Sequence, residues 1–268
     1  ELAASVQPKW AATNPQKRIR ILMKWISLIN ANMDELATML SLEHGKTFED
    51  AKGDIIRGVD VLEFALFAPH MLKGEYSESV GTGIDTYSMR QPLGVVSGIT
   101  PFNFPAMIPL WKAGPALASG NAFILKPSER DPSVPLRLAE LFIEAGGPKG
   151  VFNVINGDKE AVDAILDSPT IKAVGFVGST PIAQYIYERC AATGKRAQCF
   201  GGAKNHMLIL PDADLDLVLT CAMQAKMRNG GEACIAANRF LVDSSIAEEF
   251  TRRLTEAMEG VVMGHGLE

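Results

Sequence analysis

Apolar residues recur at helical spacing through the first quarter of the chain. Between Gln16 and Gly45 they fall three or four positions apart, and glycine commonly ends a helix. The pattern resumes from Asp54 to Phe67 and stops before Pro69, because proline disrupts a helix interior. The apolar positions of the first stretch are Ile19, Leu22, Met23, Ile26, Ile29, Leu36, Met39 and Leu40. The pattern predicts a helical N-terminal segment.

From Ile84 onward, short runs of β-type residues alternate with helical stretches. The runs are LGVVSGI, NAFILK, VFNVI, KAVGFVG, HMLIL and RFLVD, and the helical stretches lie near residues 105–120, 133–146, 158–167, 180–193, 214–228 and 245–260. Strands that alternate with helices across short joints of Gly, Pro and Asp are typical of βαβ units. The predicted fold class is therefore α/β, with a parallel sheet covered by helices on both faces.

Composition narrows the class of protein. The chain has 268 residues, of which 47% are apolar, and its 26 basic and 31 acidic residues give a net charge of −5 without a basic block. We expect no nucleic-acid partner, because such a partner needs a basic surface. No apolar run approaches the roughly 18 residues of a membrane span, and no signal-peptide pattern is present, so no membrane association is expected. The predicted location is the cytoplasm, or the mitochondrial matrix in a eukaryote.

The four cysteines, Cys190, Cys199, Cys221 and Cys234, show no CxxC spacing. We therefore expect no disulfide and no bound metal. For the first three, a packing role is expected. Cys234 differs because it lies in RNGGEACIAAN, where a pair of glycines allows close approach of the backbone. It is a candidate nucleophile, and inert packing is the alternative.

Ligands of parallel sheets bind beyond the carboxyl ends of the strands, so the joints after the strands are candidate sites. The usual dinucleotide fingerprint GxGxxG is absent. In GFVGSTP, however, a strand ends at Gly178, Ser179 and Thr180, and Pro181 suits the first turn of a helix. Free main-chain N–H groups and two hydroxyls there could face a pyrophosphate. An ordinary turn with a Ser or Thr helix cap is the alternative.

Two further joints carry polar side chains. ILKPSER places Lys126 and Glu129 at one sheet edge, where the ammonium could donate to a ribose diol and the carboxylate could accept from it. ITPFNFP holds Asn103 in a rigid joint, where its amide could donate to a developing oxyanion. A surface ion pair and a turn-forming asparagine are the respective alternatives.

Together and in this order, the motifs identify a family. TPFNFP, KPSE, GFVGST, GGAKN and GGEACIAANRF resemble motifs of the NAD(P)-dependent aldehyde dehydrogenases, from about residue 15 to the end. The segments before Ala225 are most similar to methylmalonate-semialdehyde dehydrogenases, whereas AKMRNGGEACIAANRFLVDSSIAEEF is more similar to succinate-semialdehyde dehydrogenases.

The resemblance implies three parts. An N-terminal helical segment, residues 1–83, would pack on a Rossmann-type NAD-binding domain, residues 84–203. Residues 204–268 would begin an α/β catalytic domain. The resemblance also implies a chain that is incomplete at its C-terminus, and a homodimer or homotetramer for the full-length parent.

The resemblance assigns roles to the joints. Cys234 as thiolate would attack an aldehyde carbon, and the Asn103 amide and the main-chain N–H of Cys234 would hold the oxyanion. The thiohemiacetal would pass a hydride to the nicotinamide and leave a thioester. The residues implied to contact the cofactor are Thr100, Phe102, Lys126, Glu129, Arg130, Ser179 and Gly201. Because Glu129 would pair with a free 2′-hydroxyl and repel a 2′-phosphate, NAD is favoured over NADP.

Two departures from the family bear on the reaction. Hydrolytic members carry a glutamate base ahead of the paired glycines, and Cys199 is assigned to that position here. The methylmalonate enzymes also lack the base and use coenzyme A, so propanoyl-CoA or acetyl-CoA is the predicted product.

The second departure concerns the substrate. Where the methylmalonate enzymes carry an arginine beside the nucleophile, this chain has Ala233. Arg228 and Arg57 are instead expected to bind the carboxylate of a small semialdehyde, although Arg57 could be an ordinary surface arginine.

Three alternatives stay open. A hydrolytic enzyme of the succinate-semialdehyde type would result if Glu232 replaced the missing base. A truncated chain would be an inactive NAD-binding protein. A cysteine hydrolase would need a histidine base. None of the four histidines lies in a recognisable Cys–His motif: His44, His70, His206 and His265.

Overall fold

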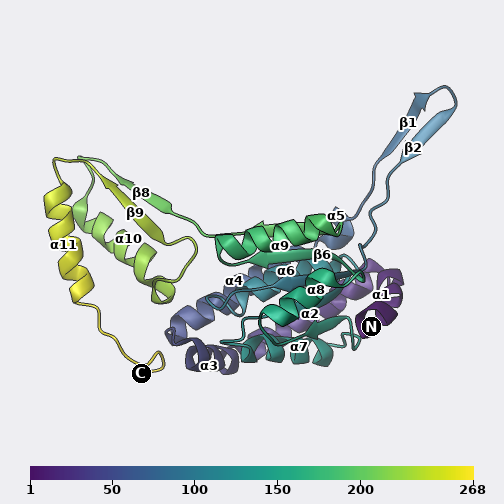
Figure 1. Cartoon of the computed structure of the whole chain (residues 1–268), viewed down its shortest axis with the longest axis horizontal. Helices are drawn as coiled ribbons and strands as arrows, with labels where there is room; N and C mark the ends of the chain where they lie inside the picture. The colour runs from purple at the N-terminus through teal and green to yellow at the C-terminus, as the bar shows by residue number, and fades with distance from the viewer.

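The computed structural model describes residues 1–268 and centres on a parallel sheet of five strands in the order β5-β4-β3-β6-β7 (Figure 1). The strands are β3 Val95–Ile99, β4 Ala122–Lys126, β5 Phe152–Val154, β6 Ile171–Val177 and β7 Arg196–Phe200. β3 is buried at all five positions, as expected for a central strand covered on both faces. The predicted α/β class with a parallel sheet is confirmed.

Helices cover both faces of the sheet. The largest core cluster, of 30 buried residues, joins one face to the N-terminal helices and to α6 and α7. A second cluster, of 12 buried residues, joins the other face to α8 and α9. The adjacent residues Val95 and Val96 of β3 fall in different clusters, because successive strand residues point to opposite faces. The helices are α1 Leu2–Ala12, α2 Pro15–Ala31, α3 Met33–His44, α4 Phe48–Ala65, α5 Ala68–Met71, α6 Met107–Ala118, α7 Ser133–Glu144, α8 Lys159–Asp167 and α9 Thr180–Ala192.

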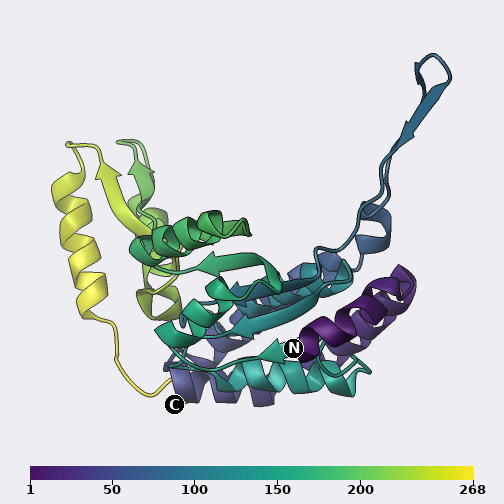
Figure 2. The same ribbon diagram turned by 45° about the vertical axis from the view of Figure 1, so that its right-hand side comes forward.

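The last quarter of the chain forms a smaller layer beside the main sheet (Figures 1 and 2). The parallel strands β8 Asn205–Ile209 and β9 Ala237–Val242 pair with each other, and α10 Leu215–Met227 and α11 Ala247–Glu259 pack on them. The C-terminal segment then returns to the start of α4, where the Phe48 N–H donates to the Gly266 carbonyl at 3.0 Å.

An antiparallel hairpin, β1 Tyr76–Gly81 and β2 Ile84–Tyr87, projects away from the body of the molecule (Figure 2). This hairpin was not predicted from the sequence. Its turn contains residue 83, the predicted boundary between the N-terminal segment and the Rossmann-type domain. The division into three parts stays a prediction. No helix combines the length and hydropathy needed to cross a bilayer.

All six predicted strands and the six helical stretches after residue 84 are present. The sequence pattern missed α1, α5, β7 and the hairpin strands, and it did not separate α2 from α3, which part at Asn32. Asn32 lies outside helical geometry, and its side chain donates to the Leu28 carbonyl at 2.7 Å. This local hydrogen bond competes with continuation of the helix.

Candidate active site

Cys234 lies in an exposed loop between a short 3-10 turn, η1 Arg228–Gly231, and strand β9. The chain reverses through left-handed backbone at Asn229, Gly230 and Gly231. Ala233 and Ala236 on either side of the cysteine are buried in a small apolar cluster with Phe104, Met107 and Ile108. These alanines anchor the loop on the joint after β3, while the thiol itself stays accessible.

The predicted oxyanion donor meets this loop. The Asn103 side-chain amide, in the joint between β3 and α6, donates to the Glu232 carbonyl at 2.7 Å. A primary amide has two N–H donors, so one remains for a ligand. The main-chain N–H of Cys234 donates no hydrogen bond within the chain. The loop therefore offers two free donors near one thiol, as an oxyanion site requires.

The Asn103 joint is held from beneath by a buried ion pair that sequence reasoning missed. Lys46 Nζ lies 2.9 Å from Asp54 Oδ2, and neither side chain is exposed. Lys46 also donates to the Asn103 carbonyl at 2.9 Å, and Asp54 accepts from the Met107 N–H at 2.7 Å. Burial raises the pKa of Asp54, and the charge of Lys46 opposes that rise.

A cavity of about 960 Å³ opens beside Cys234, between α6 and the β6–β7 edge of the sheet. Its lining includes Trp111, Lys112, Gln198, Phe200 and Cys234, but no Asp, Glu or His. The cavity therefore offers neither a carboxylate nor an imidazole base to a group bound on Cys234. The histidine that a cysteine hydrolase would need is absent from it.

Lys112 reaches across the sheet into this cavity. Gly98 and Gly175 lie opposite each other on β3 and β6, and a Cβ at either would come within 3.1 Å of the lysine side chain. Because glycine has no side chain, these two positions leave space on the sheet face for Lys112. Burial lowers the pKa of Lys112 to about 8, with the thiol of Cys199 opposing the shift. No carboxylate in the cavity neutralises this ammonium.

Cys199, the residue assigned to the position of the glutamate base, does not line the cavity beside Cys234. Cys199 pairs with Phe176 on β6 and packs against the α8–α9 core, whereas Phe200 lines the Cys234 cavity. Val177, the partner of Phe200, packs against the cluster that holds Ala233. Because side chains alternate along a strand, Cys199 and Phe200 point to opposite faces of β7. The inference that no carboxylate occupies this position is unchanged.

A second cavity, of about 650 Å³, lies at the carboxyl ends of β3, β4 and β6, where ligands of parallel sheets bind. It gathers six of the seven residues implied to contact NAD: Thr100, Phe102, Lys126, Glu129, Arg130 and Ser179. The seventh, Gly201, lines the Cys234 cavity instead. Of the two hydroxyls predicted to face a pyrophosphate, only Ser179 lines the second cavity; Thr180 Oγ1 instead accepts from the Gly202 N–H at 2.9 Å.

The second cavity fits a dinucleotide. Its volume lies within the usual range for ligand pockets. Thr100 Oγ1 is buried without a hydrogen-bond partner, and the N-terminus of α9 carries no side-chain cap. This hydroxyl and the first main-chain N–H groups of α9 are therefore available to a ligand. Lys126 donates to Glu129 at 3.0 Å, and Arg130 stacks on the Phe102 ring with 4.8 Å between its guanidinium carbon and the ring centroid.

Glu129 is ionised at neutral pH. Its own main-chain N–H and the Lys126 ammonium both lower the pKa of its carboxyl group. An ionised carboxylate accepts a hydrogen bond from a ribose hydroxyl and repels a phosphate at the same place. This geometry is compatible with NAD.

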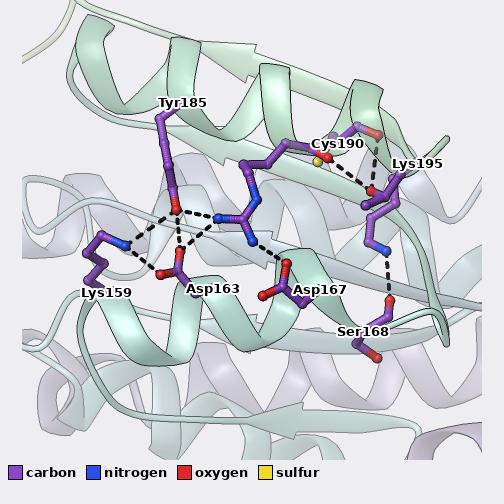
Figure 3. A network of polar contacts seen from close by, with 9 residues as sticks. Lys159, Asp163, Asp167, Ser168, Tyr185, Cys190 and Lys195 are labelled. Atoms are coloured by element: carbon purple, nitrogen blue, oxygen red, sulfur yellow. Dashed lines mark hydrogen bonds and ion pairs between the residues drawn. The ribbon is translucent and has the colours of Figure 1, made fainter.

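The far wall of the second cavity is braced by a polar network between α8 and α9 (Figure 3). Tyr185 Oη donates to Asp163 at 2.6 Å and accepts from Lys159 at 3.4 Å. At the other end of these helices, Lys195 donates to the Ser168 carbonyl at 2.7 Å. Because Lys159 and Tyr185 line the cavity, the network fixes its width at that wall.

Known proteins share this arrangement. The sequence profile of the aldehyde dehydrogenase family matches residues 1–268. The chain belongs to that family. It is 50% identical over 267 residues to malonate-semialdehyde dehydrogenase of Pseudomonas aeruginosa, a match that covers 99% of this chain and 54% of that protein. The chain spans about half the length of the curated relatives it matches.

Solved structures of aldehyde dehydrogenases superpose closely. A Sinorhizobium meliloti protein, described as a methylmalonate-semialdehyde dehydrogenase and crystallised with NAD, matches with a TM-score of 0.96 and 58% identity over 99% of this chain and 54% of its own. Methylmalonate-semialdehyde dehydrogenase of Oceanimonas doudoroffii matches with a TM-score of 0.96 and 47% identity, over 99% of this chain and 55% of its own.

The two arginines predicted to bind substrate do not line the Cys234 cavity. Arg57 is exposed on α4, one turn before Val61, which does line it. The Trp111 indole in the cavity wall donates to the Arg57 carbonyl at 3.0 Å. Arg228 begins the turn before Cys234, and its buried Nε has no hydrogen-bond partner.

The remaining cysteines differ in exposure. Cys190 is buried and Cys199 is half-buried, as packing roles require, and burial raises the pKa of both thiols. Cys221 is exposed on α10, so the packing role predicted for it is wrong. Helical spacing alone did not reveal which face of α10 is covered.

Proposed function

We propose that this chain carries the nucleophile and the NAD site of an enzyme that oxidises a semialdehyde of the malonate or methylmalonate class and transfers the acyl group to coenzyme A. The observation that carries the proposal is the contact of the Asn103 amide with the Cys234 loop, at 2.7 Å from the Glu232 carbonyl, beside a cavity without a carboxylate. The names of the relatives support the substrate class.

The chemistry follows from the loop. Cys234 Sγ would bond to the aldehyde carbon, and the carbonyl oxygen would become an oxyanion. The free N–H of the Asn103 amide and the main-chain N–H of Cys234 would stabilise it, and the loss of one such donor typically costs ~10²–10³ in rate. Bound NAD would supply the acceptor for the hydride that leaves the same carbon. An acyl thioester on Cys234 remains.

Release of the thioester depends on the nucleophile that reaches it. Water needs a general base, and the cavity contains no carboxylate or imidazole to serve as one, while a thiolate attacks without a base. The sulfur of coenzyme A would bond to the acyl carbon as the bond to Cys234 breaks. The bond to the substrate's carboxylate would break with loss of carbon dioxide, and the α-carbon, left with the electron pair of that bond, would take a proton from water, which gives acetyl-CoA or propanoyl-CoA. The carboxylate of Glu232, the alternative base, lies 3.1 Å from His44 and does not line the cavity.

Arg228 and Arg57 are proposed to bind the carboxylate of the semialdehyde. The unpaired, buried Nε of Arg228 supports this role, since a guanidinium left without an acceptor suits an anionic ligand. Arg228→Ala and Arg57→Ala should each raise KM for malonate semialdehyde far more than for propanal, which has no charge to pair. Equal effects on the two aldehydes would show that the arginines are structural.

The test uses a chimaera in which this chain replaces the matching half of the Pseudomonas aeruginosa relative. Rapid mixing with NAD and malonate semialdehyde, without coenzyme A, should give a burst of about one NADH per site and then a slow phase. Coenzyme A should accelerate the slow phase. Phe200→Glu should raise the rate without coenzyme A, whereas Cys199→Glu, on the opposite face of β7, should not. Fast, linear release of free acid without coenzyme A would overturn the proposal.

A further inference from the structure

The main-chain carbonyl of Asn103 accepts two hydrogen bonds from side chains that are remote in sequence. Asn229 Nδ2 donates to it at 2.8 Å, and Lys46 Nζ donates at 2.9 Å. A carbonyl oxygen has two lone pairs, so both are occupied. The backbone that carries the Asn103 amide is therefore fixed from two directions.

Asn229 is itself rigid. It is 1% exposed, and its main-chain N–H donates to Asp50 Oδ2 at 2.9 Å. Its φ of 58° lies in the left-handed region, which asparagine tolerates better than most residues. Asn229 lies in the turn that leads into the Cys234 loop. Its rigid position therefore limits the movement of that loop.

Two hydrogen bonds run in opposite directions between the same two segments. The Asn229 amide donates to the Asn103 carbonyl, and the Asn103 amide donates to the Glu232 carbonyl. They tie the two segments at two separate points. Together they fix both the place and the orientation of the Asn103 amide relative to Cys234.

We propose that Asn229 is a positioning residue for the oxyanion donor, an inference that rests on the proposed function. It touches no reacting atom and acts through Asn103. Oxyanion donors work within about 2.7–3.1 Å of the developing charge, and a misplacement of about 1 Å can cost ~10²-fold in rate. Asn229 is one of two donors to the Asn103 carbonyl, so its loss should cost part of that factor.

Asn229→Gly isolates the side chain. Glycine adopts the left-handed backbone readily and keeps the main-chain N–H for Asp50, while the amide is lost. Two reagents then separate positioning from general disruption. Acylation of Cys234 by 4-nitrophenyl acetate passes through an oxyanion, whereas alkylation by iodoacetamide does not.

We expect Asn229→Gly to slow acylation of Cys234 by about tenfold and to leave alkylation within about twofold. The matched control is Asn238→Ala, which removes an exposed amide whose oxygen accepts from Lys226 at 3.2 Å; it should change neither rate. In an Asn103→Ala background, Asn229→Gly should have no further effect on acylation, since the positioned group is gone.

The outcomes separate the two claims. If Asn103→Ala leaves acylation of Cys234 unchanged, or if Cys234→Ala leaves the release of 4-nitrophenol unchanged, the proposed function fails, and the positioning role fails with it. If Asn103→Ala slows acylation but Asn229→Gly does not, only the positioning role is overturned. Equal losses in acylation and alkylation, or full additivity with Asn103→Ala, would show a merely structural asparagine and overturn it as well.

Discussion

Replacement of Asp54 by leucine tests the buried ion pair beneath the Asn103 joint. Lys46 and Asp54 lie 2.9 Å apart with no exposed side-chain surface. Without Asp54, the Lys46 ammonium would keep only the Asn103 carbonyl and the face of the Phe104 ring, 4.8 Å from its centroid. Neither neutralises its charge. The Met107 N–H would also lose its acceptor.

The expected loss is large. Breaking a buried pair by removing one partner costs about 3–5 kcal/mol. A buried N–H left without an acceptor costs about 1–3 kcal/mol, and the two terms share a neighbourhood and add incompletely. We therefore expect Asp54→Leu to lower the free energy of unfolding by about 4–6 kcal/mol, a large part of the ~5–15 kcal/mol typical of a domain.

Urea unfolding followed by far-UV circular dichroism measures this loss. The double variant Lys46→Met with Asp54→Leu should recover most of it, because an apolar pair of similar volume can replace a buried ion pair. A loss below about 1 kcal/mol for Asp54→Leu, or no recovery in the double variant, would refute the reasoning that an uncompensated charge dominates.

Two further predictions use single side chains. Because burial lowers the pKa of Lys112 to about 8, its protonation opposes folding fully below pH 8, and that penalty fades as the pH rises toward the unfolded value of about 10.5. Lys112→Met should therefore stabilise the protein at pH 7 by up to about 3 kcal/mol and by less at pH 9.5, as measured by urea unfolding at both values; an equal gain at both would contradict the cause. Glu129→Gln should reduce the preference for NAD over NADP at least tenfold, about 1.4 kcal/mol, in fluorescence titrations, and an unchanged ratio would exclude Glu129 from the 2′-position.

The elements with clear periodicity could be predicted from the sequence. Helices such as α7 and strands such as β4 have the apolar spacing typical of their element. Strand β7 could not be predicted in this way, because its sequence RAQCF has the half-exposed pattern of an edge strand and no buried run. The face that Cys199 takes depends on its register with β6, which local sequence does not reveal.

The candidate site was predictable where residues of one joint act together. Lys126 and Glu129 are three positions apart, so their contact follows from local geometry. The contact of Asn229 with Asn103 joins residues 126 positions apart, and that of Lys46 with Asn103 joins residues 57 apart. Such contacts arise only when the chain has folded, and neither residue type signals them by itself. The unusual φ of Asn229 is visible only in the structure.

The site of acylation tests the central claim most directly. Cys221 and Cys234 are both exposed, so both are accessible to a reagent. After a limiting dose of 4-nitrophenyl acetate, peptide mapping at low pH should find the acetyl group on Cys234, because only that thiol lies beside the oxyanion donors of its own N–H and Asn103. Acetylation of Cys221 at an equal or faster rate would contradict the account.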